Sequence, residues 1–250
     1  DEARTAIELL NANPNIFSES YISPKNGTRL TCGPDGKIQS KVTGNCLRHF
    51  GFTEDRDGVR KALLAHKAFA VYDAGGYSDL MTGEDAVKLW ESHNTDVGGS
   101  FNINPPIPRI LLAQVKRPDG AFVVDAISTD GGCIPRNVIL SQGLSLVKLD
   151  VLTLAEFAQK TSLNPARMLR LTAKGHLSVG ADADITIYDY ATQTPKMSFV
   201  EGRKVLFKGE VLGKNANIIC TERGQKAIEA RGLKAIVVDP GLPVDRVKAL

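Results

Sequence analysis

Residues 162–184, with the sequence SLNPARMLRLTAKGHLSVGADAD, decide the fold of this chain. The pair Asn164-Pro165 favours the start of a helix, because Asn caps helices and Pro is tolerated in the first helical turn. After Gly175 the apolar residues recur with a period of two, and residues 183–188 alternate as a β-strand does. The stretch therefore predicts a helix that passes into a β-rich module.

A second informative stretch, AFVVDAI at residues 121–127, is a nearly continuous apolar run. Such a run suits a strand that is buried on both faces, as in the parallel sheets of α/β proteins. It is followed by Ser128-Thr129-Asp130 and two glycines. Because the active sites of α/β barrels lie at the carboxyl ends of their strands, Asp130 is a candidate catalytic residue. The alternative is that Asp130 only caps a loop or helix beside the strand.

The rest of the chain alternates helical and strand-like segments. Apolar periodicity predicts a strand over residues 16–21 and helices over 2–11, 54–67 and 84–92, the last two capped by Thr53 and Thr82. The capping box formed by Thr153 and Glu156 predicts another helix, which ends near Thr161. Residues 23–45 are rich in Gly, Pro, Asn, Lys and Thr, so we expect an excursion from the core there.

Length and composition exclude several classes of protein. The chain has 250 residues, a net charge of +3 and 42% hydrophobic residues, which excludes a disordered chain or a coiled coil. No apolar run reaches the roughly 18 residues of a membrane span. The small net charge and the lack of a basic and aromatic stripe argue against nucleic-acid binding. The four Cys show no C-x-x-C spacing. A disulfide between Cys32 and Cys46 is an alternative, but we expect free thiols in a cytoplasmic protein.

Residues 162–184 resemble the C-terminal hallmark of the amidohydrolase superfamily, in the branch of dihydroorotases, hydantoinases and D-aminoacylases. In that family an "NPA" helix ends the barrel, and a "KG-x-(I/L)-x-x-G-x-DAD" segment leads into a small β-sandwich. Residues 102–106 are similar to the family's "MNPPLR" strand, and residues 128–130 to its "(A/S)TD" at the end of strand 8. The resemblance implies an α/β fold: the C-terminal portion of a (β/α)8 metal-dependent hydrolase barrel, followed by strands of a small β-sandwich.

The resemblance also implies a division of the chain into three parts. Residues 1–172 would be the C-terminal part of the barrel, with an insertion at about residues 23–98. Residues 173–215 would be the β-sandwich segment, and residues 216–250 a C-terminal extension.

In this family the Asp at the end of strand 8 ligates one metal ion and takes a proton from the metal-bound water. Asp130 would therefore be a metal ligand, a general base and then the general acid that protonates the leaving nitrogen. Asn104, Cys133 and Arg136 would line the substrate pocket, with Arg136 pairing with a substrate carboxylate. The alternatives are a turn-forming Asn104 before Pro105, a small core residue at Cys133 and a surface ion pair at Arg136.

The family's other metal ligands do not occur in this sequence. They are an "H-x-H" on strand 1, a carboxylated Lys or an acid on strand 4, and His on strands 5 and 6. The chain begins at Asp1, without a Met and within a predicted helix. We therefore expect an N-terminal polypeptide to complete the barrel and to supply most ligands of one or two divalent ions, zinc in our prediction. The sequence DGGC at residues 130–133, in place of "DHAPH", argues against a dihydroorotase.

Two functions are consistent with these features. The first is part of a metal-dependent amidohydrolase that hydrolyses the C–N bond of a small-molecule substrate, either a cyclic amide or an N-acyl amino acid. The second is a non-catalytic amidohydrolase-like scaffold or oligomer subunit that lacks a complete metal site. In both cases we expect a homo-oligomer.

Overall fold

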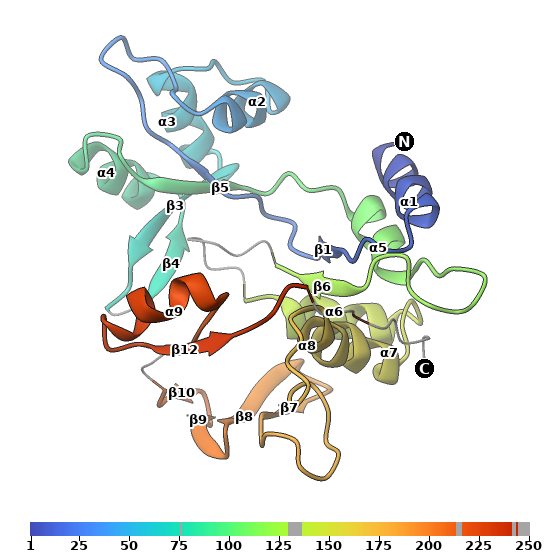
Figure 1. Cartoon of the computed structure of the whole chain (residues 1–250). Coiled ribbons are helices and arrows are strands. Elements are labelled where there is room, and N and C mark those ends of the chain that lie inside the picture. The colour runs from blue at the N-terminus through green and yellow to red at the C-terminus, as the bar shows by residue number, and fades with distance from the viewer. Residues whose placement is uncertain (76, 130–136, 214–216, 242–243, 245–250) are drawn as a thin grey trace. The chain divides into compact units, whose positions relative to one another are not determined.

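The structure is a computed structural model with a mixed α/β fold (Figure 1). It describes residues 1–75, 77–129, 137–213, 217–241 and 244. The chain divides into two compact units, and each is described by itself. Unit 1 consists of residues 1–20, 110–127 and 139–250, and unit 2 consists of residues 21–109 and 128–138.

Unit 2 is built on a four-stranded antiparallel sheet in the order β2-β5-β3-β4. Helices α3 and α4 pack against β3, and α2 packs against β2 and α3. The elements are β2 (Thr28–Arg29), α2 (Lys41–His49), α3 (Arg56–Leu64), β3 (Ala68–Asp73), β4 (Ser78–Met81), α4 (Glu84–Ser92) and β5 (Gly98–Phe101).

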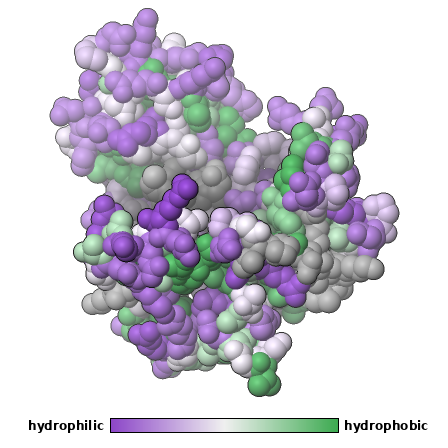
Figure 2. Space-filling model, in the orientation of Figure 1, coloured by the Kyte–Doolittle hydropathy of each residue, from purple (hydrophilic) through white to green (hydrophobic). Residues whose placement is uncertain are grey.

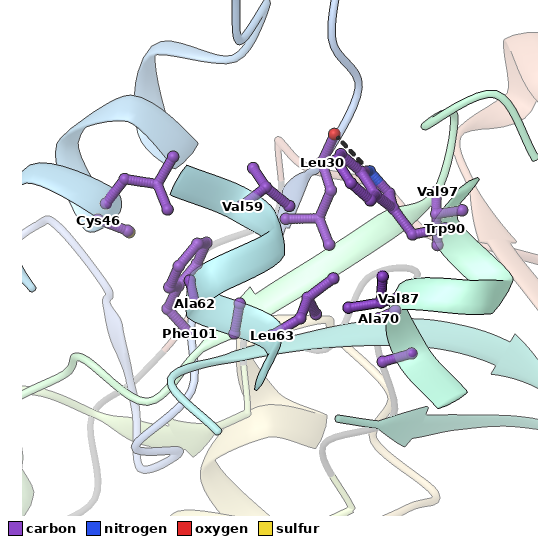
Figure 3. Close-up of a cluster of buried hydrophobic side chains, with 13 residues drawn as sticks. Leu30, Cys46, Val59, Ala62, Leu63, Ala70, Val87, Trp90, Val97 and Phe101 are labelled. Atoms are coloured by element: carbon purple, nitrogen blue, oxygen red, sulfur yellow. Dashed lines mark hydrogen bonds between the residues drawn. The ribbon is translucent and has the colours of Figure 1, made fainter. Parts of the chain in front are cut away.

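The core of unit 2 is a cluster of buried side chains that includes Trp90 (Figure 3). The indole Nε1 of Trp90 donates a hydrogen bond to the carbonyl of Leu30 at 2.9 Å. Leu63 of α3 and Phe101 of β5 are fully buried in the same cluster. The segment that the sequence suggested as an insertion is therefore folded, with a hydrophobic core of its own.

Two predicted helix caps in unit 2 are wrong. The N-cap of α3 is Asp55, whose carboxylate accepts a hydrogen bond from Gly58 N at 2.9 Å, and Thr53 instead donates to Asp55. Both hydrogen bonds lower the pKa of Asp55. At α4 the N-cap is Gly83, because the hydroxyl of Thr82 donates to the carbonyls of two residues of neighbouring elements. In each case the predicted capping hydroxyl donates to another group, and a different residue is the N-cap.

Two segments that are far apart in the sequence lie side by side where β1 (Glu19–Tyr21) pairs with β6 (Ala126–Ser128). Helix α1 (Glu2–Ala12) precedes β1. Asp125 N and Ala126 N both donate to the carbonyl of Ser18, and Ile22 N donates to the carbonyl of Ser128. Since both partners advance together along the chain, β1 and β6 run in the same direction. Of the predicted strand at residues 121–127, only the last two residues lie in β6.

Helices follow β6 in unit 1. The predicted capping box is present, since the Thr153 hydroxyl and the Glu156 carboxylate each bond the other's backbone N–H. The helix that it opens continues without a break through residue 168. The elements after β6 are α6 (Ile139–Lys148), α7 (Leu154–Ala158), the π-helical turn η1 (Gln159–Leu163) and α8 (Asn164–Met168). Helix α5 (Pro106–Gln114) precedes β6 and begins in the last residues of unit 2.

The chain ends in two small β-structures. The first is an antiparallel sheet in the order β10-β9-β8-β7, which contains β7 (Ile185–Asp189), β8 (Thr194–Val200), β9 (Arg203–Phe207) and β10 (Glu210–Val211). The second is a parallel pair, β11 (Asn217–Cys220) and β12 (Lys234–Val237), connected by α9 (Glu222–Glu229). Large apolar side chains on the first sheet, including Ile185 and Ile187, are exposed. Figure 2 shows hydrophobic residues among hydrophilic ones on the face in view.

The observed architecture agrees with the predicted α/β class. The sheets formed by the described residues contain two or four strands, and none of these sheets closes on itself. Across the described residues, we find no helix with the length and apolar character needed to cross a membrane.

Two adjacent glycines of β5 give a test of the core of unit 2. A Cβ on Gly99 would lie 2.4 Å from Leu30 Cγ, whereas a Cβ on Gly98 would lie 3.4 Å from Val71 Cγ2, an ordinary contact. We expect Gly99→Ala to lower the free energy of unfolding by about 1–3 kcal/mol through overpacking, and Gly98→Ala to change it much less. Urea unfolding followed by the fluorescence of Trp90, the single Trp, measures both. Equal effects of the two substitutions would contradict the packing described here.

Candidate functional site

Three of the four predicted site residues lie outside the described residues. They are Asp130, Cys133 and Arg136, and the last described residue before them is Thr129. Their predicted roles therefore stay predictions. The surroundings of the segment that leads to them are described, and they show how the end of β6 is held.

Asn104, the fourth predicted residue, follows β5 in unit 2. Its side-chain amide donates to the carbonyl of Ser23 at 3.1 Å, and its backbone N–H donates to the carbonyl of Pro24 at 3.0 Å. Asn104 thus ties the end of one strand to the segment that follows β1. These contacts leave its predicted role in substrate binding a prediction.

Arg109, which the sequence analysis did not single out, holds the same segment. Its guanidinium Nη1 donates to the carbonyl of Ile22 at 2.6 Å, and Nε donates to the carbonyl of Pro105 at 3.2 Å. Ile22 N in turn donates to the carbonyl of Ser128 at 2.9 Å. Partial burial lowers the pKa of Arg109. Arg109 therefore holds Ile22, which is bonded to Ser128 at the end of β6. Ser128 lies two positions before Asp130 in the sequence.

The start of β6, in unit 1, is surrounded by buried polar groups. The carboxylate of Asp125 accepts a hydrogen bond from Ser18 N at 3.0 Å. The ammonium of Lys160 donates to the carbonyl of Val124 at 2.5 Å, and the amide of Asn164 donates to the carbonyl of Asp125 at 2.7 Å. Lys160 has no exposed surface, and Asp125 and Asn164 are also buried. We call Asp125, Lys160 and Asn164 the strand-start cluster.

Burial is the largest influence on the pKa of Lys160. It lowers the pKa of Lys160 to about 7, although the negative charges of Asp125 and Glu156 act in the opposite direction. The ammonium lies 4.0 Å from the centre of the Phe122 ring, a cation–π contact that favours the charged form.

The neighbouring Glu156 is buried and belongs to the same helix. Burial acts to raise the pKa of Glu156, but hydrogen bonds from Lys116 and Thr153 together bring it below its ordinary value. Glu156 thus stays ionised near Lys160. The Glu156 carboxylate is bonded to Thr153 N and to the Lys116 ammonium. Glu156 therefore holds the start of α7 and pairs with Lys116.

The described residues do not form a metal site by themselves. In the part of the chain that the structure describes, no group of three His, Cys, Asp or Glu side chains could hold a metal ion. The carboxylate of Asp125, the acid nearest to β6 in the sequence, is bonded to Ser18 N. Any metal ion that acts at the end of β6 would therefore need ligands from outside the described residues.

The pKa of Lys160 leads to a pH dependence of stability. It is about 7 in the folded chain against an ordinary value of 10.5, so between these values the unfolded chain binds more protons and stability rises with pH. Below pH 7 both states are protonated and the full cost of burying the ammonium remains. We expect the stability of the wild type relative to Lys160→Met to increase from pH 7 to pH 10, by at most about 1.4 kcal/mol per pH unit.

Urea unfolding followed by circular dichroism at several pH values checks this dependence. Lys148→Met, which removes an exposed lysine of the same unit, controls for the loss of a surface charge. A wild-type advantage over Lys160→Met that stays constant across this pH range would contradict the depressed pKa.

Comparison with known proteins gives matches in the same region. The model of the amidohydrolase family Amidohydro_3 matches residues 144–212. One component of the formyltransferase/hydrolase complex Fhc from Methylorubrum extorquens is 30% identical over 121 residues, which are 46% of this chain. The match covers 20% of that protein, so the chain spans about a fifth of the length of this curated relative.

Solved structures of D-aminoacylase are similar in fold. One, from work on the binuclear metal centre of D-aminoacylase, has a TM-score of 0.52 at 15% sequence identity. The match covers 85% of this chain and 44% of the D-aminoacylase chain. Another, said to define a novel subset of amidohydrolases, has a TM-score of 0.51 at 14% identity over the same shares. At this identity the likeness concerns the fold alone. Residues 144–212 thus match the amidohydrolase family model, and they include the motifs at residues 162–184 that predicted this resemblance.

Proposed function

We propose that the chain is the C-terminal part of a metal-dependent amidohydrolase that hydrolyses a C–N bond. The observation that carries this proposal is the match of residues 144–212 to the amidohydrolase family. The parallel pairing of β1 and β6 supports it, since parallel neighbours are what a (β/α)8 barrel requires. In this proposal residues 1–172 belong to the barrel, residues 173–215 to a small β-sandwich and residues 216–250 to an extension.

Asp130 is the proton carrier of the proposed reaction. It takes a proton from the attacking water, whose oxygen forms a bond to the carbonyl carbon of the substrate. When the C–N bond breaks, Asp130 delivers this proton to the leaving nitrogen, so that an acid and an amine are released. A divalent metal ion, zinc in our proposal, supplies Lewis acidity when it is bound.

The substrate is a small amide, and three residues are proposed to contact it. The solved D-aminoacylases of similar fold favour an N-acyl amino acid over a cyclic amide. Arg136 would pair with the carboxylate of such a substrate, because its guanidinium can make two parallel hydrogen bonds. Cys133 and Asn104 would line the pocket.

A second polypeptide is part of this proposal. The described residues do not complete a metal site, so an N-terminal polypeptide would supply most of the ligands together with the missing barrel strands. The exposed apolar side chains of the β7–β10 sheet offer it a surface to cover. We place the assembled protein in the cytoplasm as a homo-oligomer.

A non-catalytic scaffold is the second candidate. Two observations favour it: the described residues hold no metal-ligand cluster, and the curated relative from Methylorubrum is named as a component of a complex. The two candidates differ in composition, because only the enzyme needs both a second polypeptide and a metal.

Intact mass spectrometry and metal analysis of the native protein separate the two candidates. For the enzyme we expect a second polypeptide that carries the H-x-H ligands, and a stoichiometric divalent metal. A single metal-free polypeptide that is inactive on N-acyl amino acids would refute the catalytic proposal.

Substitution of the proposed proton carrier gives a narrower test. Asp130→Asn keeps the size of the side chain but loses the basic carboxylate, so we expect turnover of an N-acyl amino acid to fall by about 100-fold or more. Size-exclusion chromatography should show an unchanged assembly. Turnover close to that of the wild type would rule out the role of Asp130.

A further inference from the structure

The helix over residues 154–168 contains an unusual turn. Within it, Asn164 N donates to the carbonyl of Gln159, five residues earlier, instead of four. Pro165 gives a local reason, because a proline inside a helix lacks an N–H and its ring clashes with the carbonyl four residues before it. A wider turn relieves this clash. Such single π-turns are rare in helices and are frequent at functional sites.

Two side chains of this turn reach the backbone just before β6. Lys160 donates to the carbonyl of Val124 at 2.5 Å, and Asn164 donates to the carbonyl of Asp125 at 2.7 Å. The backbone bends at Val123 and Val124, before the strand begins. In a regular strand, successive carbonyls point to opposite sides. Because the backbone bends here, the successive carbonyls of Val124 and Asp125 can both face the same helix.

The other side of Asp125 is held as firmly. Its backbone N–H and its carboxylate bond the carbonyl and the N–H of Ser18, at 3.0 Å each. Asp125 is therefore fixed from two sides, by Ser18 and by Asn164, while Lys160 fixes the residue before it. The strand that starts at Ala126 leaves this point in a defined direction.

Stability alone is a poor reason for a lysine at this position. Burial lowers the pKa of Lys160 to about 7, which shows that the fold disfavours its charged form. An apolar side chain of similar shape often replaces a buried charge at no loss of stability. Departures of this kind from local rules are expected at functional sites.

We propose that Lys160 and Asn164 are positioning residues that hold the start of β6 so that its end presents the residues of the hydrolytic site. This inference rests on the proposed function, because Asp130 follows β6 in the sequence. The pair would act through the backbone of residues 124–128 and would contact neither substrate nor metal. Misplacing a catalytic group by about 1 Å can cost about 100-fold in rate, so such support matters for turnover.

Two variants and one control test the inference in the complete assembly. Lys160→Met and Asn164→Leu keep the approximate size of each side chain but remove the donor. The control is Thr161→Val, which loses a hydrogen bond of the same turn, to the carbonyl of Phe157, without touching residues 124 and 125. Circular dichroism checks that each variant is folded, and Asn164→Ala replaces Asn164→Leu if the branched apolar side chain prevents folding.

Hydrogen exchange gives a readout that does not depend on activity. We expect the amides of Asp125 and Ala126 to exchange about tenfold faster in both donor variants, the factor to which one hydrogen bond of about 1.4 kcal/mol corresponds. The control should leave their exchange unchanged. Unchanged exchange in the donor variants would overturn the inference, whatever their activity.

Turnover of an N-acetyl amino acid then separates support from catalysis. We expect kcat to fall by about 10- to 100-fold in both donor variants, as for residues that orient catalytic groups, with KM little changed. Unchanged kcat, in an enzyme that Asp130→Asn inactivates, overturns the positioning role but not the proposed function. Full turnover of Asp130→Asn overturns the proposed function and the positioning role with it. The amide exchange of Asp125 and Ala126 still shows whether Lys160 and Asn164 hold the strand.

Discussion

Every buried carbonyl needs a hydrogen-bond donor, and this constraint is acute at Val124 and Asp125. The chain bends there, outside any strand, so side chains supply the donors in place of a neighbouring strand. Lys160 and Asn164 come from one turn of one helix and reach both carbonyls. In our proposal, the direction in which β6 starts depends on this contact. The cost is a buried amine, which is visible in the pKa of Lys160 of about 7.

Much of the secondary structure could be predicted because its signals are local. Helix α1, the capping box of Thr153 and Glu156, and the strand β7 follow from periodicity and from residues three apart. Helix α2 was missed because its sequence, KVTGNCLRH, contains Gly, Thr and Asn, and its stability comes from burial of Cys46 and Leu47. The position of Asn164 was read as a helix cap, whereas its amide serves a carbonyl 39 residues away. No local pattern could reveal that partner.

The candidate site divides in the same way. The motif that ends in Asp130 was visible in the sequence, but the supports of β6 were not, because each depends on a contact across the fold. Arg109 and Lys160 carry no motif of their own, and only their bonds to the carbonyls of Ile22 and Val124 single them out. The helix pattern gives no signal either, because Glu156, Gln159 and Asn164 are polar and buried along with Lys160. Residues 144–212 match the amidohydrolase family model, and hydrolysis at the end of β6 is our proposal.

The bond between Arg109 and Ile22 has a consequence for how the chain folds. Ser18 and Asp125 are 107 residues apart, and closing a flexible loop of that length is slow and costly in entropy. Once unit 2 has folded, the bond of Arg109 to the Ile22 carbonyl keeps residues 22 and 109 together. The flexible loop between Ser18 and Asp125 then contains only the four residues before Ile22 and the sixteen after Arg109. This shortening lowers the entropic cost of loop closure by about 1.5 kcal/mol. A folded unit 2, with its own core, therefore shortens the flexible loop that separates the two strands.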